Sequence, residues 1–190
     1  MGFPAFFFWS NIMKIVLIGI QGSGKSTQGN LLSEKLGVPY LSTGHIFREL
    51  AKEKTPLGRY IKETMNCGYL FPDDKTLEIV NDYLSRPEYQ KGYILDGFPR
   101  TIEQAEKFKN GISAVFYFKV SDEEALRRLS LRDDDREDAA TAAIQRRIKI
   151  FHKFTEPVIE YYNSQGKLHE VNGEDSIDEV QSQISHILNI

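Results

Sequence analysis

A segment near the start of the chain has the residue spacing of a phosphate-binding loop. Residues 19–26 read Gly-Ile-Gln-Gly-Ser-Gly-Lys-Ser, which satisfies G-x-x-x-x-G-K-[ST] and follows an apolar run typical of a buried strand. In such a loop, backbone N–H groups and a helix N-terminus surround phosphate oxygens, and the lysine reaches the β- and γ-phosphates. A glycine-rich turn without a ligand is the alternative, but the flanking strand and helix favour a nucleoside triphosphate.

Asp96 is a candidate for the metal that accompanies such a nucleotide. It ends the apolar run 93–95, so we expect it at the carboxyl edge of a buried strand, where open α/β sheets bind ligands. Taken alone, an aspartate at this position more often caps a helix or forms a turn. Because a phosphate loop precedes it, we expect Ser26 and Asp96 to hold Mg²⁺, directly or through water.

Composition limits the class of protein. The chain has 190 residues, of which 41% are hydrophobic, enough for the core of one domain. Its 24 basic and 27 acidic residues nearly cancel, so it lacks the basic surface that binds a nucleic acid polymer. The single cysteine, Cys67, can form no intramolecular disulfide and no zinc site by itself. We therefore expect a cytoplasmic protein that binds small molecules.

Residues 1–12 form an aromatic-rich extension ahead of Met13. The segment is too short to span a bilayer and lacks the basic start and cleavage pattern of a signal peptide. We expect a product of an upstream start codon or a remnant of cloning, with a surface anchor or an added packing segment as the alternative. The functional domain is predicted to be residues 13–190, with no membrane association.

Short β-rich runs alternate with longer helical stretches, as they do in βα units. Parallel strands that are buried on both faces need helices on both sides. The sequence therefore predicts an α/β protein, a three-layer α/β/α sandwich around a five-stranded parallel sheet. The predicted strands are 14–18, 38–41, 93–95, 114–120 and 168–171.

Residues that are typical of helix ends mark where the predicted helices begin and stop. One runs over 25–36 and is closed by Gly37, and another runs over 73–84 with an acidic first turn. A long helix over 139–165 is expected to bend at Pro157.

Two more helices are predicted to begin with capping boxes, in which a hydroxyl and a carboxylate satisfy each other's backbone N–H groups. The pairs are Ser121 with Glu124 and Ser176 with Glu179.

Three segments together resemble the adenylate kinase family: Gly19–Gln28, Leu41–Arg48 and Asp96–Gln104, the last reading DGFPRTIEQ. A fourth piece, with arginines at 128, 132, 136 and 147 followed by Thr155-Glu156-Pro157, is similar to the hinge of that family's lid and its long helix. The resemblance covers nearly everything from Met13 to Ile190. It implies a P-loop fold with a small helical AMP-binding insert, here 42–71, and a short lid at about 131–138.

The resemblance also implies the reaction. A monomeric nucleoside monophosphate kinase, an adenylate kinase, would transfer a phosphoryl group reversibly from ATP with Mg²⁺ to AMP. The residues implied for ATP are Gly22, Ser23, Gly24, Lys25, Ser26, Thr27, Arg128 and Arg132. Those implied for AMP are Thr43, Arg48, Tyr69, Leu70, Phe71, Gly97, Phe98, Pro99, Arg100, Gln104, Arg136 and Arg147. The catalytic residues would be Lys25, Arg100, Arg132, Arg136 and Arg147.

Structural interpretations of these residues remain open beside the functional ones. The arginines could be solvated or paired with the acidic run 133–135, and Tyr69 and Phe71 could simply pack the insert. The lid arginines Arg132 and Arg136 are closer together than in short-lid relatives, which predicts a minimal lid.

Two rival functions follow from the same sequence. Pyrimidine-preferring relatives usually carry Ala and Asn where this chain has Thr43 and Thr101, which favours AMP over UMP or CMP as acceptor. His45 stands where the family usually has Asp, and Ser26 where it usually has Gly. His45 and the short acidic lid suggest the second rival, a catalytically weak nucleotide-binding regulatory protein.

Overall fold

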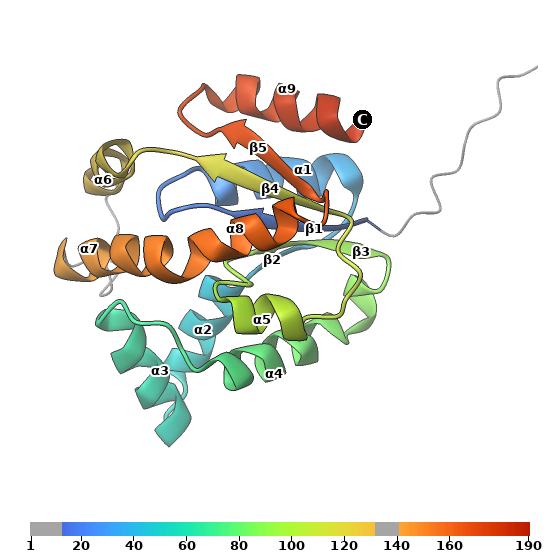
Figure 1. The fold of residues 1–190 in the computed structure, drawn as a ribbon. Coiled ribbons are helices and arrows are strands. Elements are labelled where there is room, and N and C mark those ends of the chain that lie inside the picture. The colour runs from blue at the N-terminus through green and yellow to red at the C-terminus, as the bar shows by residue number, and fades with distance from the viewer. Residues whose placement is uncertain (1–12, 132–140) are drawn as a thin grey trace, which may run out of the picture.

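The computed structural model describes residues 13–131 and 141–190. Its centre is a parallel sheet in the order β2-β3-β1-β4-β5 (Figure 1). The strands are β1 (Met13–Ile18), β2 (Tyr40–Ser42), β3 (Gly92–Asp96), β4 (Ala114–Lys119) and β5 (Leu168–Asn172). The predicted five-stranded parallel α/β fold is confirmed.

Helices cover both faces of the sheet. They are α1 (Lys25–Leu36), α2 (Thr43–Lys52), α3 (Pro56–Asn66), α4 (Asp73–Leu84), α5 (Ile102–Lys107), α6 (Asp122–Ser130), α7 (Thr141–Ile150), α8 (Glu156–Asn163) and α9 (Ile177–Leu188), with a 3-10 turn at Pro87–Tyr89 and a π-helical turn at Phe151–Thr155. Ile15 and Leu17 of β1 share a buried cluster with residues of α1 and α9, whereas Val16 and Ile18 share the other with residues of α4, α5 and α8. Figure 1 shows α1 and α9 on one face of the sheet and α5 and α8 on the other. Successive side chains of β1 thus point to opposite faces of the sheet and pack against the helices on both sides.

Strand β2 begins two residues later than predicted. Pro39 has no N–H to give to a ladder, so regular pairing starts at Tyr40, although the Pro39 carbonyl accepts from the N–H of Ile94 at 2.9 Å. Helices α1 and α4 have the predicted bounds, and the Gly37 backbone with φ 65° closes α1.

One of the two predicted capping boxes is complete. Ser176 and Glu179 exchange both bonds at the start of α9. At α6 the prediction is half wrong, because Ser121 accepts from the backbone of Glu124 but the Glu124 carboxylate does not return the bond. Instead, Oε1 of Glu174 accepts from the backbone N–H of Ser121 at 2.8 Å and from its hydroxyl at 2.7 Å.

The predicted long helix is interrupted. The π-helical turn Phe151–Thr155 separates α7 from α8. The departure from α-helical geometry therefore precedes Pro157 rather than falling on it. Pro157 lies in the first turn of α8 and cannot donate a backbone bond, and its ring excludes the regular position of the carbonyl four residues earlier. The wider π turn accommodates this proline. Residues 139–140 of the prediction lie outside the described part of the chain.

Helices α2 and α3 pack against each other below the carboxyl edge of the sheet (Figure 1). Ile46 and Ile61 are buried, and the ring of Phe71 lies 5.4 Å from both Phe47 and Tyr60. Phe71 therefore does pack within this helical pair. Among the described residues, none of the helices has the length and apolar character that a membrane crossing requires.

Candidate active site

The ends of three strands meet at one edge of the sheet. Asp96, the last residue of β3, pairs in register with Leu17 of β1 and with Ser42 of β2. The loops after these strands therefore open at the same edge. A cavity of about 400 Å³ lies there, lined by the phosphate loop, α2, α3, residues 96–100 and the junction of α7 with α8.

The phosphate loop presents an unblocked helix start. Gly24 precedes α1 with a left-handed φ of 91°, and within the described structure no side chain caps this helix. Free N–H groups and the positive end of the helix dipole consequently face the cavity. The Lys25 ammonium donates to the carbonyls of Gly19 and Ile20, both at 2.8 Å, and to the Ser23 hydroxyl at 3.1 Å. This arrangement concentrates positive charge where phosphate oxygens would enter.

Three guanidinium groups line the same cavity. They belong to Arg48 of α2, Arg100 after β3 and Arg147 of α7. Burial, the largest influence, lowers the pKa of Arg100; the charge of Asp96 opposes this, and the charges of Arg147 and Arg48 add to the lowering. Cations that repel one another in a partly buried site are stabilised by an anionic ligand.

Arg100 is held by its own loop and by the π turn. Its Nε donates to the carbonyl of Gly97 at 2.7 Å, and its carbonyl accepts from the Thr155 hydroxyl at 2.9 Å. Gly97 has a φ of 80°, and a Cβ there would fall 2.6 Å from Oγ1 of Thr43 and 3.0 Å from Nη2 of Arg100. Only glycine therefore lets the arginine and the threonine approach this backbone.

Asp96 has one satisfied and one unsatisfied oxygen. Its Oδ2 accepts from the Tyr40 hydroxyl at 2.7 Å, whereas its buried Oδ1 has no hydrogen-bond partner within the described structure. Burial, then the Asp96 charge and the bond to it, raise the pKa of Tyr40, while Ser42 and Ser26 lower it by smaller amounts. The residue lines the cavity with only 8% of its surface exposed, and Oδ1 itself is buried.

Gln104 and Thr43 are fixed by bonds within the protein. The Gln104 amide donates to Oδ1 of Asp73 at 2.6 Å and accepts from the backbone of Arg100 at 2.8 Å. Thr43 donates to the carbonyls of Asp96 at 3.2 Å and Gly97 at 2.9 Å. Gln104 lines the cavity, whereas Thr43 is buried and is not part of its lining.

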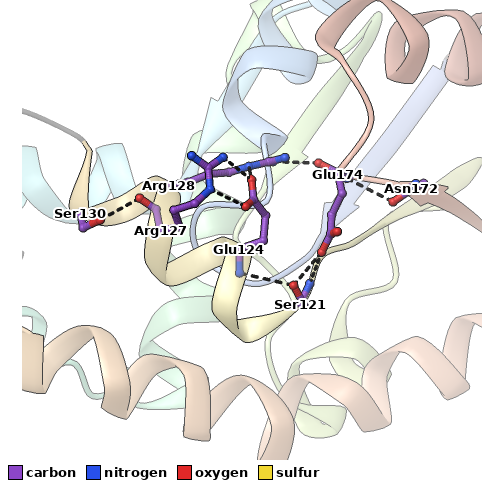
Figure 2. Close-up of polar contacts among 8 residues, drawn as sticks. Ser121, Glu124, Arg127, Arg128, Ser130, Asn172 and Glu174 are labelled. Carbon is purple, nitrogen blue, oxygen red and sulfur yellow. Dashed lines mark hydrogen bonds and ion pairs between the residues drawn. The ribbon is translucent and has the colours of Figure 1, made fainter.

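Arg128 lies on the outer flank of the phosphate loop. Its Nε donates to Oε1 of Glu124 at 2.6 Å and its Nη1 donates to the carbonyl of Gly173 at 2.7 Å (Figure 2). Bonds from Arg127 and then Arg128 lower the pKa of Glu124 to about 2. Helix α6 packs on the loop so closely that a Cβ at Gly22 would fall 2.9 Å from the carbonyl of Ala125.

The structure brings most of the predicted site residues together. Those that line the cavity are Gly22, Gly24, Lys25, Ser26, Arg48, Tyr69, Leu70, Phe71, Asp96, Gly97, Phe98, Pro99, Arg100, Gln104 and Arg147. Ser23, Thr27, Thr43 and Arg128 are not part of its lining. Arg132 and Arg136 lie outside the described residues.

The predicted site also omitted three polar cavity residues that bond predicted site residues. Tyr40 bonds Asp96, Gln21 accepts from Arg147 at 3.1 Å, and Thr155 holds Arg100. No local pattern identifies Tyr40 or Gln21, because both partners are distant in sequence. Helix α5 was also missed, although Thr101 with Gln104 has the spacing of a capping box, and Thr101 does cap the Gln104 N–H.

Comparison with known proteins agrees with this site. The family model described as adenylate kinase matches residues 17–167. A protein named adenylate kinase from Clostridium botulinum (strain Loch Maree / Type A3) is 39% identical over 212 aligned residues, which cover 93% of this chain and 98% of the relative.

Relatives from other organisms carry the same name. The protein from Acetivibrio thermocellus is 36% identical over 216 residues and that from Methanothrix thermoacetophila 36% over 215, each covering 93% of this chain and 98% of the relative. Since these alignments are longer than the chain of 190 residues, the relatives contain internal residues that it lacks. The phosphate loop, the arginine-lined cavity and these matches together show that the chain belongs to the adenylate kinase family.

Proposed function

We propose that this protein is an adenylate kinase that transfers the terminal phosphoryl group of MgATP to AMP, reversibly, to give two ADP. The observation that carries the proposal is one cavity lined both by a phosphate loop and by Arg48, Arg100 and Arg147, the last of which also bonds Gln21 of the loop. Each of these two sets of groups is suited to a phosphate chain, and the relatives named adenylate kinase point to these two nucleotides.

The donor side is the phosphate loop. The uncapped start of α1 and the ammonium of Lys25 would bind the β- and γ-phosphates, with Gly22, Gly24 and Ser26 in the lining. Ser23 and Thr27 would act through the loop backbone and the first turn of α1. Arg128, on the flank, would lie at the base end of ATP.

The acceptor side is formed by residues 42–71 together with the segment after β3. Arg48 and Arg100 would bind the phosphate of AMP, and Gln104 with the backbone near Tyr69 would lie beside the adenine. The Gln104 amide must then give up or share its bond to Asp73 when the base binds.

The chemistry needs charge stabilisation and alignment rather than a general base. An oxygen of the AMP phosphate, already anionic, attacks the γ-phosphorus of ATP in line, and the bond from this phosphorus to the β–γ bridging oxygen breaks. Lys25, Arg100 and Arg147 would stabilise the charge on the transferring group. Arg132 and Arg136 stay predicted partners in this role, within the short lid expected at about 131–138.

Ser26 and Asp96 fit the metal of MgATP. Both residues line the cavity: Asp96 has a buried, unpartnered acceptor in Oδ1, and Ser26, an exposed residue, follows Lys25. Within residues 13–131 and 141–190, no three His, Cys, Asp or Glu side chains converge on a metal position. Because Mg²⁺ is commonly held by one or two protein groups together with substrate phosphates, we expect it to enter on ATP, where it would neutralise phosphate charge.

A nucleotide screen with the full chain tests the proposal. Purified protein is given MgATP with AMP, CMP or UMP, and ADP formation is followed in a coupled assay. AMP should be the preferred acceptor by at least roughly tenfold, because the cavity would pair its polar groups with adenine. Preference for CMP or UMP would show a pyrimidine kinase, and intact ATP binding without ADP formation would show a regulatory protein.

The same preparation tests the expected oligomeric state. We infer a monomer from the resemblance to the adenylate kinase family, and a cytoplasmic protein because its single cysteine can form no intramolecular disulfide. Light scattering coupled to size exclusion checks the mass of 21.8 kDa expected for one chain.

A further inference from the structure

Tyr40 and Asp96 form a polar contact that the phosphoryl-transfer account leaves unused. Tyr40 begins β2, Asp96 ends β3, and the phenol donates to Oδ2 of Asp96 at 2.7 Å. Both residues line the cavity. The phenol thus occupies one carboxylate oxygen and leaves the other, Oδ1, buried and without a partner among the described residues.

The space for this phenol is provided by Gly29 of α1. A Cβ at Gly29 would fall 2.7 Å from Cδ2 of Tyr40 and nearer still to Cε2. Any side chain at this position would therefore displace the ring. The helix that follows the phosphate loop and the strand that carries the phenol are fitted to each other beside Asp96.

We propose that Tyr40 is a positioning residue for the metal of MgATP: its hydroxyl fixes the Asp96 carboxylate so that Oδ1 faces the metal or a water bound to it. The inference rests on the proposed function. A carboxylate held by one donor keeps a single orientation and loses little entropy when its second oxygen binds a cation. A phenol suits this task because it remains a donor throughout the neutral pH range.

The test separates metal-dependent from metal-independent nucleotide binding. Tyr40→Phe removes only the hydroxyl. Calorimetric titration of the full chain with ATP in EDTA should give the same affinity as wild type within about twofold, because no direct phosphate contact changes. With Mg²⁺ present, the gain in ATP affinity should shrink by roughly tenfold, and the Mg²⁺ concentration for half-maximal ADP formation should rise by a similar factor.

Tyr162→Phe is the matched control. Tyr162 of α8 is also buried, and its hydroxyl has no hydrogen-bond partner in the described part of the chain. Loss of this hydroxyl should leave the Mg²⁺ dependence unchanged. Urea unfolding of both variants shows whether either change alters stability.

Gly29→Ala tests the mechanism with the hydroxyl retained. Displacing the ring should weaken the Mg²⁺-linked gain in ATP affinity as expected for Tyr40→Phe, and the double variant should lose no more of this gain than either single one. Additive losses, or equal Mg²⁺ dependence in wild type and a folded Tyr40→Phe, would overturn the inference. Absence of ADP formation in wild type would instead refute the proposed function, so the two failures are distinguishable.

Discussion

Arg147 bonds directly to the phosphate loop, since its Nη1 donates to Oε1 of Gln21 at 3.1 Å. Its Nη2 donates to the carbonyl of Met65 at the end of α3, at 2.8 Å. One guanidinium therefore joins the donor side of the cavity to the helical pair on the acceptor side. The place between the two phosphate chains is where charge develops during transfer.

Arg147→Ala should lower kcat by roughly 10²- to 10³-fold, because in the proposed mechanism it removes a donor that would stabilise the transferring group. Steady-state ADP formation measures the effect, and circular dichroism shows that the variant folds. Arg86→Ala is the matched control, since Arg86 pairs with Asp82 at the surface and does not line the cavity. Equal losses in both variants would assign Arg147 a general structural role.

Lys25→Met should also lower kcat by roughly 10²-fold or more while the fold is retained. The methionine keeps the aliphatic chain but removes the charge that would face the β- and γ-phosphates in the proposed complex. Lys35→Met, at the other end of α1, should leave turnover unchanged, because Lys35 bonds Ser185 and Ile190 far from the cavity. Near-normal turnover of Lys25→Met would contradict its assigned role.

Thr155→Val should raise the KM for AMP and lower the free energy of unfolding by about 1 kcal/mol. The hydroxyl donates to the carbonyl of Arg100, so its loss leaves that carbonyl unsatisfied and frees the arginine loop. Urea denaturation and kinetics at varied AMP provide the measurement. Thr155→Ser retains the donor and should behave like wild type; if Val and Ser variants behaved alike, the bond would have no such function.

His152 gives stability a pH dependence. Its Nδ1 lies 2.6 Å from Oε1 of Glu156 and its Nε2 lies 2.9 Å from Oδ1 of Asp122. The bond to Glu156, then contacts with Asp122, outweigh partial burial and raise the pKa of His152 above its ordinary 6.5. The stabilisation is therefore complete below about pH 6.5 and is lost as the pH rises through the higher folded-state value.

His152→Gln should consequently cost more stability at pH 6 than at pH 9. The difference should not exceed about 1 kcal/mol, because all three side chains are substantially exposed. Urea unfolding of both proteins at the two pH values decides the matter. A cost that is the same at both pH values, or larger at pH 9, would show that the imidazolium does not stabilise the fold.

Features that depend on residues close together in the sequence could be predicted from short sequence patterns. Helix α1 was predicted to the residue because the glycine at 37 can take the positive φ that ends it. The phosphate loop and the polar end of β3 were likewise visible in short segments. Their convergence on one edge follows from parallel strands, which the apolar runs predicted.

Features that depend on tertiary contact were not predictable in the same way. The Glu124 carboxylate accepts from two arginines instead of capping the helix. The backbone N–H of Ser121 donates to Glu174, which is distant in the sequence. The contact of Tyr40 with Asp96 depends on the pairing of β2 with β3. These hydrogen-bond partners are determined by residues that are close in space but distant in sequence, so no local spacing pattern predicts them.

The central claim is that two nucleotides bind end to end in one cavity. It is tested most directly by calorimetric titration with a bisubstrate ligand, two adenosines joined through a polyphosphate chain. We predict one bound molecule per chain, affinity at least roughly 10²-fold higher than that of ATP or AMP, and competition with both nucleotides. Competition with ATP alone, at an affinity no better than that of ATP, would contradict the account.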